Sequence, residues 1–122
     1  MKTHLTTVKN YKLLFVPIRG KDILVSGLIG FSEAHEDEAH YGMSHLLEHV
    51  LLHSWAKHPE YDINTELLNQ GVGTNASTHS EYVWYHALGG SENLEFMTEY
   101  ITAIMTNPSI TDKVIETEKH AV

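Results

Sequence analysis

The sequence contains no cysteine in its 122 residues. That absence excludes a disulfide framework and any metal site built on thiolates. Positive charge is also scarce, since eight Lys and Arg residues stand against sixteen Asp and Glu residues, for a formal net charge of −8. Phosphate recognition needs clustered Lys and Arg, so we expect no nucleic-acid partner.

Long apolar runs are absent too. None approaches the roughly 18 residues needed to span a bilayer, and residues 1–10 are polar and lack the apolar core of a secretory signal. We therefore expect no membrane partner and a cytoplasmic location. The length, with 42% hydrophobic and 20% charged residues, predicts one soluble domain over residues 1–122 with a modest core.

Histidine, in contrast, is abundant, with ten residues in the chain. Residues 42–53 contain no helix breaker after Gly42, and we expect a helix there. At 3.6 residues per turn, His45 and His49 lie one turn apart on one face, so both imidazoles can reach one ion, with Glu48 beside them. Two imidazoles, a third ligand and an open fourth position describe a catalytic Zn²⁺ site, which lowers the pKa of its water to about 7. Glu48 can then act as the general base that accepts the proton of that water.

Two neighbouring features are interpreted as structural. His53 lies one further turn along the helix. Three imidazoles on a straight helix spread along about 12 Å, which is too far for one tetrahedral ion. The segment 31–41 before the helix is dense in acids and histidines, and we expect a solvated loop there.

The other segments predict an α+β fold. Strands are expected at 11–16 and 22–30, which would form a hairpin, and at 72–79 and 81–88, where aromatic and β-branched residues alternate. Helices are expected at 62–69 with Asp62 as the N-cap, at 91–106 with Ser91 as the cap, and from 111 or 112 onward. This order predicts a mostly antiparallel sheet with helices packed on one face.

Several stretches, in order, resemble the pitrilysin-type zinc peptidases, the family of insulin-degrading enzyme and the mitochondrial processing peptidase. Residues 30–33, a polar loop and residues 42–54, which contain the inverted motif His-x-x-Glu-His, are similar to the family's entry strand, loop and zinc helix. Residues 68–85 resemble its Gly-x-x-Asn-Ala-x-Thr segment. Residues 107–108 and 115–122 resemble the approach to its third zinc ligand. The chain as a whole looks like the first part of a pitrilysin-type metallopeptidase domain.

The resemblance implies roles for further residues. Asn75 and Ala76 would lie on an edge strand that pairs with an extended peptide substrate. Glu118 matches a family carboxylate near the zinc, and is a candidate to support a metal-binding histidine. The family's third ligand is a glutamate that would fall at position 125, past Val122. We therefore expect this ligand from a partner chain or from further sequence.

These observations predict a zinc-dependent metalloendopeptidase that hydrolyses extended peptides. A non-catalytic member of the same fold, which binds peptides or acts as a scaffold, stays open because the third ligand is missing. A generic metal-binding module that uses its many histidines is a third alternative. An open sheet edge and an apolar helix face predict self-association or a partner subunit, and in a homodimer the acids of residues 33–38 could supply the third ligand.

Overall fold

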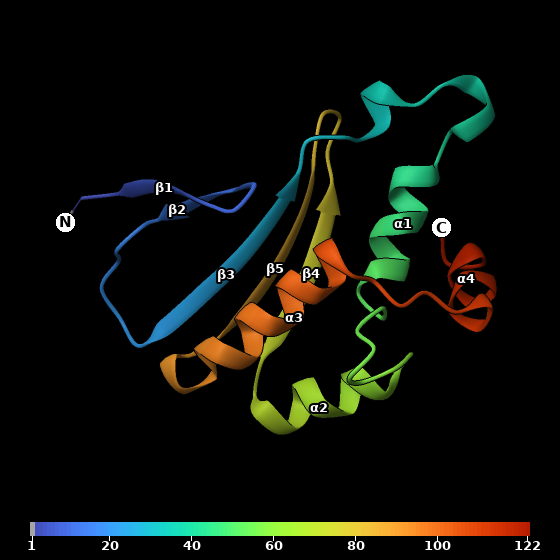
Figure 1. Cartoon of the computed structure of the whole chain (residues 1–122). Helices are drawn as coiled ribbons and strands as arrows, with labels where there is room; N and C mark the ends of the chain where they lie inside the picture. The colour runs from blue at the N-terminus through green and yellow to red at the C-terminus, as the bar shows by residue number, and fades with distance from the viewer. Residues whose placement is uncertain (1) are drawn as a thin grey trace.

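A computed structural model describes residues 2–122. Residue 1, which belongs to the predicted domain and to its polar N-terminal segment, lies outside the described residues. Within them, two separate antiparallel sheets form (Figure 1). In the smaller sheet, β1 (His4–Val8) pairs with β2 (Tyr11–Phe15). The larger sheet has the order β3 (Asp22–Ile29), β5 (Val83–Gly90), β4 (Gly73–Thr78), which leaves β3 and β4 as its edges.

Four α-helices accompany the sheets in the described residues: α1 (Met43–Leu51), α2 (Asp62–Gln70), α3 (Leu94–Thr106) and α4 (Asp112–Lys119). α3 lies along β3 and β5, whereas α1 contacts both β4 and α4 (Figure 1). None of the helices between residues 2 and 122 combines the length and the apolar character that crossing a membrane requires. The architecture confirms the predicted α+β class with a mostly antiparallel sheet.

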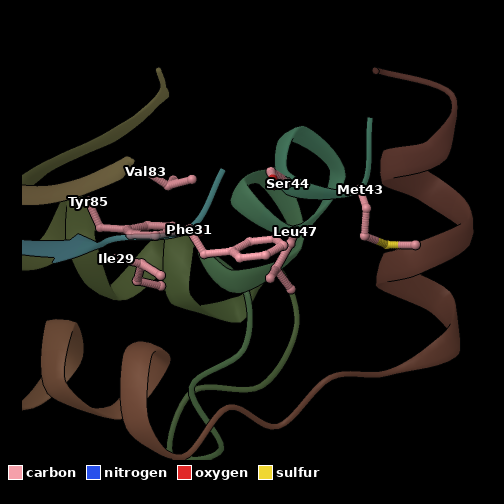
Figure 2. Close-up of a pocket in the computed structure, with 7 residues that line it drawn as sticks. All are labelled: Ile29, Phe31, Met43, Ser44, Leu47, Val83 and Tyr85. Carbon is pink, nitrogen blue, oxygen red and sulfur yellow. The ribbon is translucent and has the colours of Figure 1, made fainter. Parts of the chain in front are cut away.

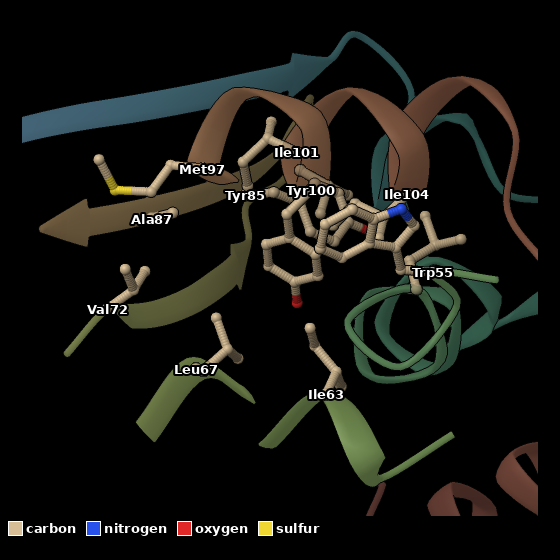
Figure 3. Packing of buried hydrophobic residues seen from close by; sticks show 12 residues of the cluster. Trp55, Ile63, Leu67, Val72, Tyr85, Ala87, Met97, Tyr100, Ile101 and Ile104 are labelled. Atoms are coloured by element: carbon tan, nitrogen blue, oxygen red, sulfur yellow. The ribbon is translucent and has the colours of Figure 1, made fainter. Parts of the chain in front are cut away.

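The hydrophobic core lies between one face of the larger sheet and the helices (Figure 3). Alternate β5 residues, Val83, Tyr85 and Ala87, are buried on this face. They meet side chains from α1, α2, α3 and the segments that follow α1 and α2, namely Leu51, Trp55, Ile63, Leu67, Val72, Met97, Tyr100, Ile101 and Ile104. The opposite face stays open, since Leu28 is 63% exposed there. The helices therefore cover one face of the sheet, as the sequence predicts.

The predicted hairpin between residues 11–16 and 22–30 is wrong. β2 pairs instead with β1, a strand that the polar composition of residues 1–10 conceals. The two are joined through a tight turn at Lys9, whose φ is 55°. β3 pairs with β5. Burial explains the difference, because β3 and β5 share the apolar face that α3 covers, whereas every residue of β1 and β2 is exposed.

Two predicted helix caps are also wrong. Tyr61 rather than Asp62 is the N-cap of α2, and Asp62 is the first residue of that helix. Ser91 begins a short 3-10 turn, η3 (Ser91–Asn93), and α3 follows it. Asn93, at the junction, donates a side-chain hydrogen bond to the Gln70 carbonyl oxygen at 2.9 Å. A contact with the end of α2 therefore holds the residue that precedes α3, and local sequence does not reveal this contact.

The start of α1 is held by the loop before it, which contains two 3-10 turns, η1 (Glu33–His35) and η2 (Glu38–His40). Gly42, the N-cap, has a φ of 84°, which side chains with a Cβ rarely adopt. Glu36 accepts hydrogen bonds from the Ser44 N–H at 2.7 Å and the Gly42 N–H at 3.0 Å. These backbone donors hold the pKa of Glu36 below its ordinary value. A loop carboxylate thus satisfies free amides at the start of the helix.

Candidate metal centre

α1 brings His45 and His49 together on one face. Their ring centroids are 5.0 Å apart, and the two Nε2 atoms are 3.3 Å apart. Two nitrogens bound to one tetrahedral zinc at about 2.0–2.1 Å each lie about 3.3–3.4 Å apart. The two histidines therefore already have the separation of two ligands of one zinc ion.

Glu118 of α4 lies behind His49. Its Oε2 is 3.1 Å from His49 Nδ1. A carboxylate accepts hydrogen bonds, so Nδ1 carries the proton and donates it to Glu118, and Nε2 keeps its lone pair. That lone pair points toward His45 Nε2. Two ring nitrogens at this separation can share a cation, so the pair fits two of the ligands of a zinc ion.

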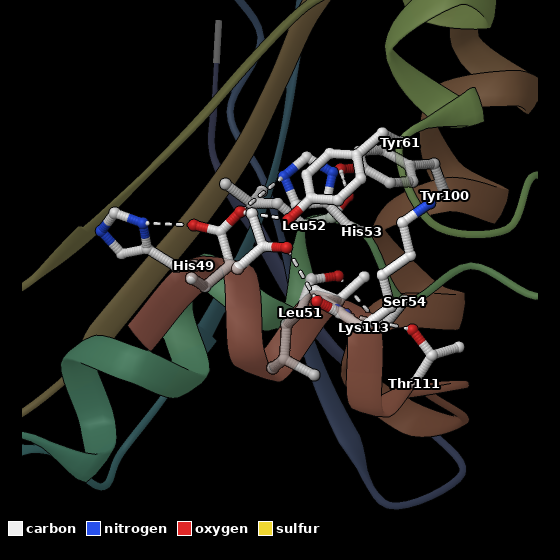
Figure 4. A network of polar contacts seen from close by, with 12 residues as sticks. His49, Leu51, Leu52, His53, Ser54, Tyr61, Tyr100, Thr111 and Lys113 are labelled. Atoms are coloured by element: carbon white, nitrogen blue, oxygen red, sulfur yellow. Dashed lines mark hydrogen bonds and ion pairs between the residues drawn. The ribbon is translucent and has the colours of Figure 1, made fainter. Parts of the chain in front are cut away.

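The other oxygen of Glu118 is held as well. Tyr61 donates its hydroxyl hydrogen bond to Oε1 at 2.7 Å, and His53 Nε2 lies 3.8 Å from the same oxygen. Figure 4 shows His49, His53 and Tyr61 in this network. Burial alone would raise the pKa of Glu118, but the bonds from Tyr61 and His49, with His53 nearby, outweigh it and hold the pKa below its ordinary value. Glu118 is therefore ionised and able to orient His49 at neutral pH.

Glu48 is buried on the side of α1 that faces the sheet. It is 8% exposed, and Thr78 of β4 donates its hydroxyl hydrogen bond to Glu48 Oε2. Burial, and to a lesser extent the Glu48 carboxylate, raise the pKa of Tyr85. The contact with Thr78 fixes one carboxylate oxygen of Glu48 and leaves Oε1 as a potential acceptor.

β4 is an edge strand of the larger sheet, as the resemblance implies for Asn75 and Ala76. Asn75 is exposed, and Ala76 is partly buried among the residues that face the core. The Asn75 Oδ1 atom accepts a hydrogen bond from the Ala76 N–H at 2.8 Å. The side chain of Asn75 thus binds the amide of the residue that follows it. Because Thr78 follows on the same strand, β4 links the proposed peptide-binding segment to Glu48.

The described residues bring together two candidate metal donors, whereas a catalytic zinc site has three protein ligands. No group of three or more His, Asp or Glu side chains converges as a metal site within residues 2–122. Glu118 faces Nδ1 of His49, away from the Nε2 pair, and His53 is directed at Glu118. The interpretation of His53 as structural agrees with this geometry. The expectation that a third ligand lies outside this set stays a prediction.

A small apolar pocket of about 70 Å³ lies beside the start of α1 (Figure 2). Its lining comes from the ends of β3 and β5 and from α1: Ile29, Phe31, Met43, Ser44, Leu47, Val83 and Tyr85. Ligand pockets usually measure about 300–1,000 Å³. This pocket is therefore smaller than a typical ligand pocket.

Sequence reasoning missed two residues of this site. Thr78 could have been found, since period-two alternation places it on the same strand face as Ala76, toward the core. Tyr61 gives no local signal, because it precedes α2 and meets Glu118 only through tertiary contact across 57 positions of sequence. The contact of His53 with Glu118 was missed for the same reason.

Comparison with known proteins identifies the family of this chain. The sequence profile of "Insulinase (Peptidase family M16)" matches residues 28–122. Human mitochondrial-processing peptidase subunit beta is 30% identical over 88 residues, which cover 72% of this chain and 18% of the human protein. Both findings agree with the resemblance seen in the motifs.

Solved structures agree on the fold. A protease from Helicobacter pylori superposes with a TM-score of 0.90 at 22% identity, covering 98% of this chain and 29% of that one. Pitrilysin superposes with a TM-score of 0.75 at 25% identity, covering 90% of this chain and 12% of its own. This chain therefore spans less than a third of the length of each relative named here. It belongs to the insulinase family of peptidases, peptidase family M16.

Proposed function

We propose that this chain carries the zinc-binding helix and the general base of a metalloendopeptidase. The observation that carries the proposal is the pair of Nε2 atoms of His45 and His49, 3.3 Å apart, with Glu118 bonded to the far side of His49. Family membership supports the class of reaction. Zinc at this pair would supply Lewis acidity, which polarises a peptide carbonyl and acidifies water.

The chain's own residues then have defined tasks. His45 and His49 would hold the ion through Nε2, and Glu118 keeps His49 in the tautomer that leaves this nitrogen free. Glu48 would accept a proton from water at Oε1 and deliver it to the leaving amine, while Thr78 holds Oε2. No covalent bond between enzyme and substrate is needed.

The substrate class follows from the sheet edge. An extended peptide can add to an edge strand through main-chain hydrogen bonds, which tolerate many side chains. On β4, Asn75 and Ala76 would receive the peptide, and Asn75 would release the Ala76 N–H to it. We infer that extended peptides are the substrates and that the third zinc donor comes from protein outside residues 1–122 or from a second chain.

A second candidate is a non-catalytic member of the family that binds peptides or a partner. The observation in its favour is that the described residues bring only two metal donors together, the Nε2 atoms of His45 and His49. Zinc bound by two imidazoles alone would be held weakly. Such a protein would keep the fold and the sheet edge and would lack turnover.

Zinc content and peptide hydrolysis, measured on the same samples, test the proposal. We expect one zinc per chain after reconstitution in the wild type, and loss of it in His49→Ala. His40→Ala is the matched control, because His40 is an exposed histidine of the preceding loop. If His40→Ala lost as much zinc as His49→Ala, the chain would be a generic metal-binding module.

Hydrolysis of a quenched peptide separates the two remaining candidates. In a peptidase, Glu48→Gln keeps zinc and loses turnover by about 10²–10⁴-fold. Stoichiometric zinc without turnover in the wild type supports the non-catalytic candidate. If the third donor comes from a second copy, activity per chain falls on dilution; constant activity per chain would contradict that source.

A further inference from the structure

Both carboxylate oxygens of Glu118 are engaged by side chains from other elements. Oε2 accepts from His49 Nδ1 at 3.1 Å, and Oε1 accepts from the Tyr61 hydroxyl at 2.7 Å. Tyr61 is the N-cap of α2, His49 lies on α1 and Glu118 on α4. Three separate elements therefore meet at one carboxylate.

We propose that Tyr61 is a positioning residue that fixes the tautomer and orientation of His49 by acting through Glu118. The inference rests on the proposed zinc site and adds a residue to it. Tyr61 is not a metal ligand, since its hydroxyl lies on the side of Glu118 away from His49.

The physical reason lies in the torsions of glutamate. Rotation about the last bond of a Glu side chain is soft, so one hydrogen bond leaves the carboxylate plane free to turn. A second bond, to the other oxygen, fixes the plane. Tyr61 supplies that bond, and Glu118 is 9% exposed, so water has little access to replace it. Burial raises the pKa of Tyr61, and the hydroxyl therefore keeps its proton and remains a donor.

His53 keeps Tyr61 in place. The two ring centroids are 4.4 Å apart, and His53 Nε2 lies 3.8 Å from Glu118 Oε1. This ring contact accompanies the hydrogen bond from the Tyr61 hydroxyl to the carboxylate, and Figure 4 shows the rings of His53 and Tyr61. The histidine one turn past the motif thus has a structural task in the same network.

The first test uses the metal-free protein and imidazole ¹⁵N chemical shifts at a pH where His49 is neutral. We expect His49 of the wild type in a single tautomer with the proton on Nδ1, and both tautomers in Tyr61→Phe, which removes only the hydroxyl. Tyr100→Phe is the matched control, because it removes a hydroxyl that donates to the Leu52 carbonyl oxygen at 2.7 Å. The control should leave the tautomer unchanged. A single Nδ1–H tautomer in Tyr61→Phe, or mixed tautomers in the wild type, would overturn the inference.

The second test measures zinc affinity by competition with a chromophoric chelator. Loss of a residue that supports a ligand typically weakens metal binding about 10–100-fold, and we expect this loss in Tyr61→Phe and not in Tyr100→Phe. In a Glu118→Ala background the Tyr61→Phe change should have no further effect, because Tyr61 acts through Glu118. Independent, additive losses would contradict that path.

The two tests separate failure of the inference from failure of the proposed function. If the wild type binds no zinc yet shows the Tyr61-dependent tautomer, the metal site is wrong and the positioning role stands. If the wild type binds zinc and Tyr61→Phe changes neither the affinity nor the tautomer, the positioning role is wrong and the metal site stands.

Discussion

At the scale of single residues, the buried carboxylate of Glu48 has a hydrogen-bond donor on the sheet. Thr78 donates a hydrogen bond to Glu48 Oε2 from the last residue of β4. A buried acceptor that loses its donor costs about 1–3 kcal/mol, whereas a substitution that keeps the hydroxyl keeps the bond.

We therefore expect Thr78→Val, which has nearly the shape of threonine, to lower the free energy of unfolding by about 1–3 kcal/mol. Thr78→Ser should retain most of the stability, although serine is the poorer strand former of the two replacements. Urea unfolding of the three proteins at neutral pH measures the difference. A Thr78→Val protein as stable as Thr78→Ser would show that the contact does not stabilise the fold.

At the scale of elements, α1 is anchored at its start by a loop and in its last turn by α4. The loop residue Glu36 accepts from the Ser44 and Gly42 amides, and Glu118 of α4 reaches His49. The histidine pair is therefore fixed by two contacts that lie outside the helix. Inside the helix, the burial of Leu51 and the contact of Glu48 with Thr78 orient α1 on the sheet.

The lowered pKa of Glu36 gives this anchor a pH dependence. A carboxyl whose pKa is lower in the folded protein contributes stability above its unfolded pKa of about 4.5, and that stability is lost as the pH falls through the folded value. We expect Glu36→Gln to unfold at a lower temperature than the wild type at pH 7, with a difference that closes below about pH 4.5.

Thermal unfolding across pH, followed by circular dichroism, checks this expectation. Glu38→Gln is the control, since Glu38 is an exposed acid in the same loop and the substitution changes the net charge equally. A difference for Glu36→Gln that persists unchanged at acid pH would mean that the ionised carboxylate is not what stabilises the start of α1.

At the scale of the whole molecule, much apolar surface is exposed. On β2, Leu13, Leu14 and Phe15 are each more than half exposed, and each strand of the β1–β2 hairpin has, within residues 2–122, one unpaired edge. The uncovered face of the larger sheet adds Leu24, Leu28 and Leu88. Surfaces of this kind associate with other chains or with further parts of the same polypeptide.

We therefore expect the protein of residues 1–122 to self-associate, with a mass that rises with concentration in light scattering. Replacing Leu14 and Phe15 with lysine should reduce the association with little change in thermal stability, because both side chains are exposed. A stable, monodisperse monomer across the concentration range would contradict the expectation of a partner or of self-association.

The sequence by itself determined the class of the fold and the helix with its histidines. Periodicity alone places His45 and His49 on one face, and strand alternation predicts β4 and β5 close to their observed bounds. These features depend on residues that are near one another in the chain.

Only the tertiary structure decided what lies around the histidine pair. The contacts of Thr78, Tyr61 and His53 join elements far apart in sequence, which meet through packing of the core. The pairing of β3 with β5 and the contact at the start of α3 also depend on such packing. Glu118 depends on both sequence and tertiary structure. The resemblance predicts that it lies near the proposed metal site, and the packing of α4 on α1 decides that it faces His49 Nδ1. Local periodicity fixes which residues share a face, but the distance between two faces is set by the side chains buried between them.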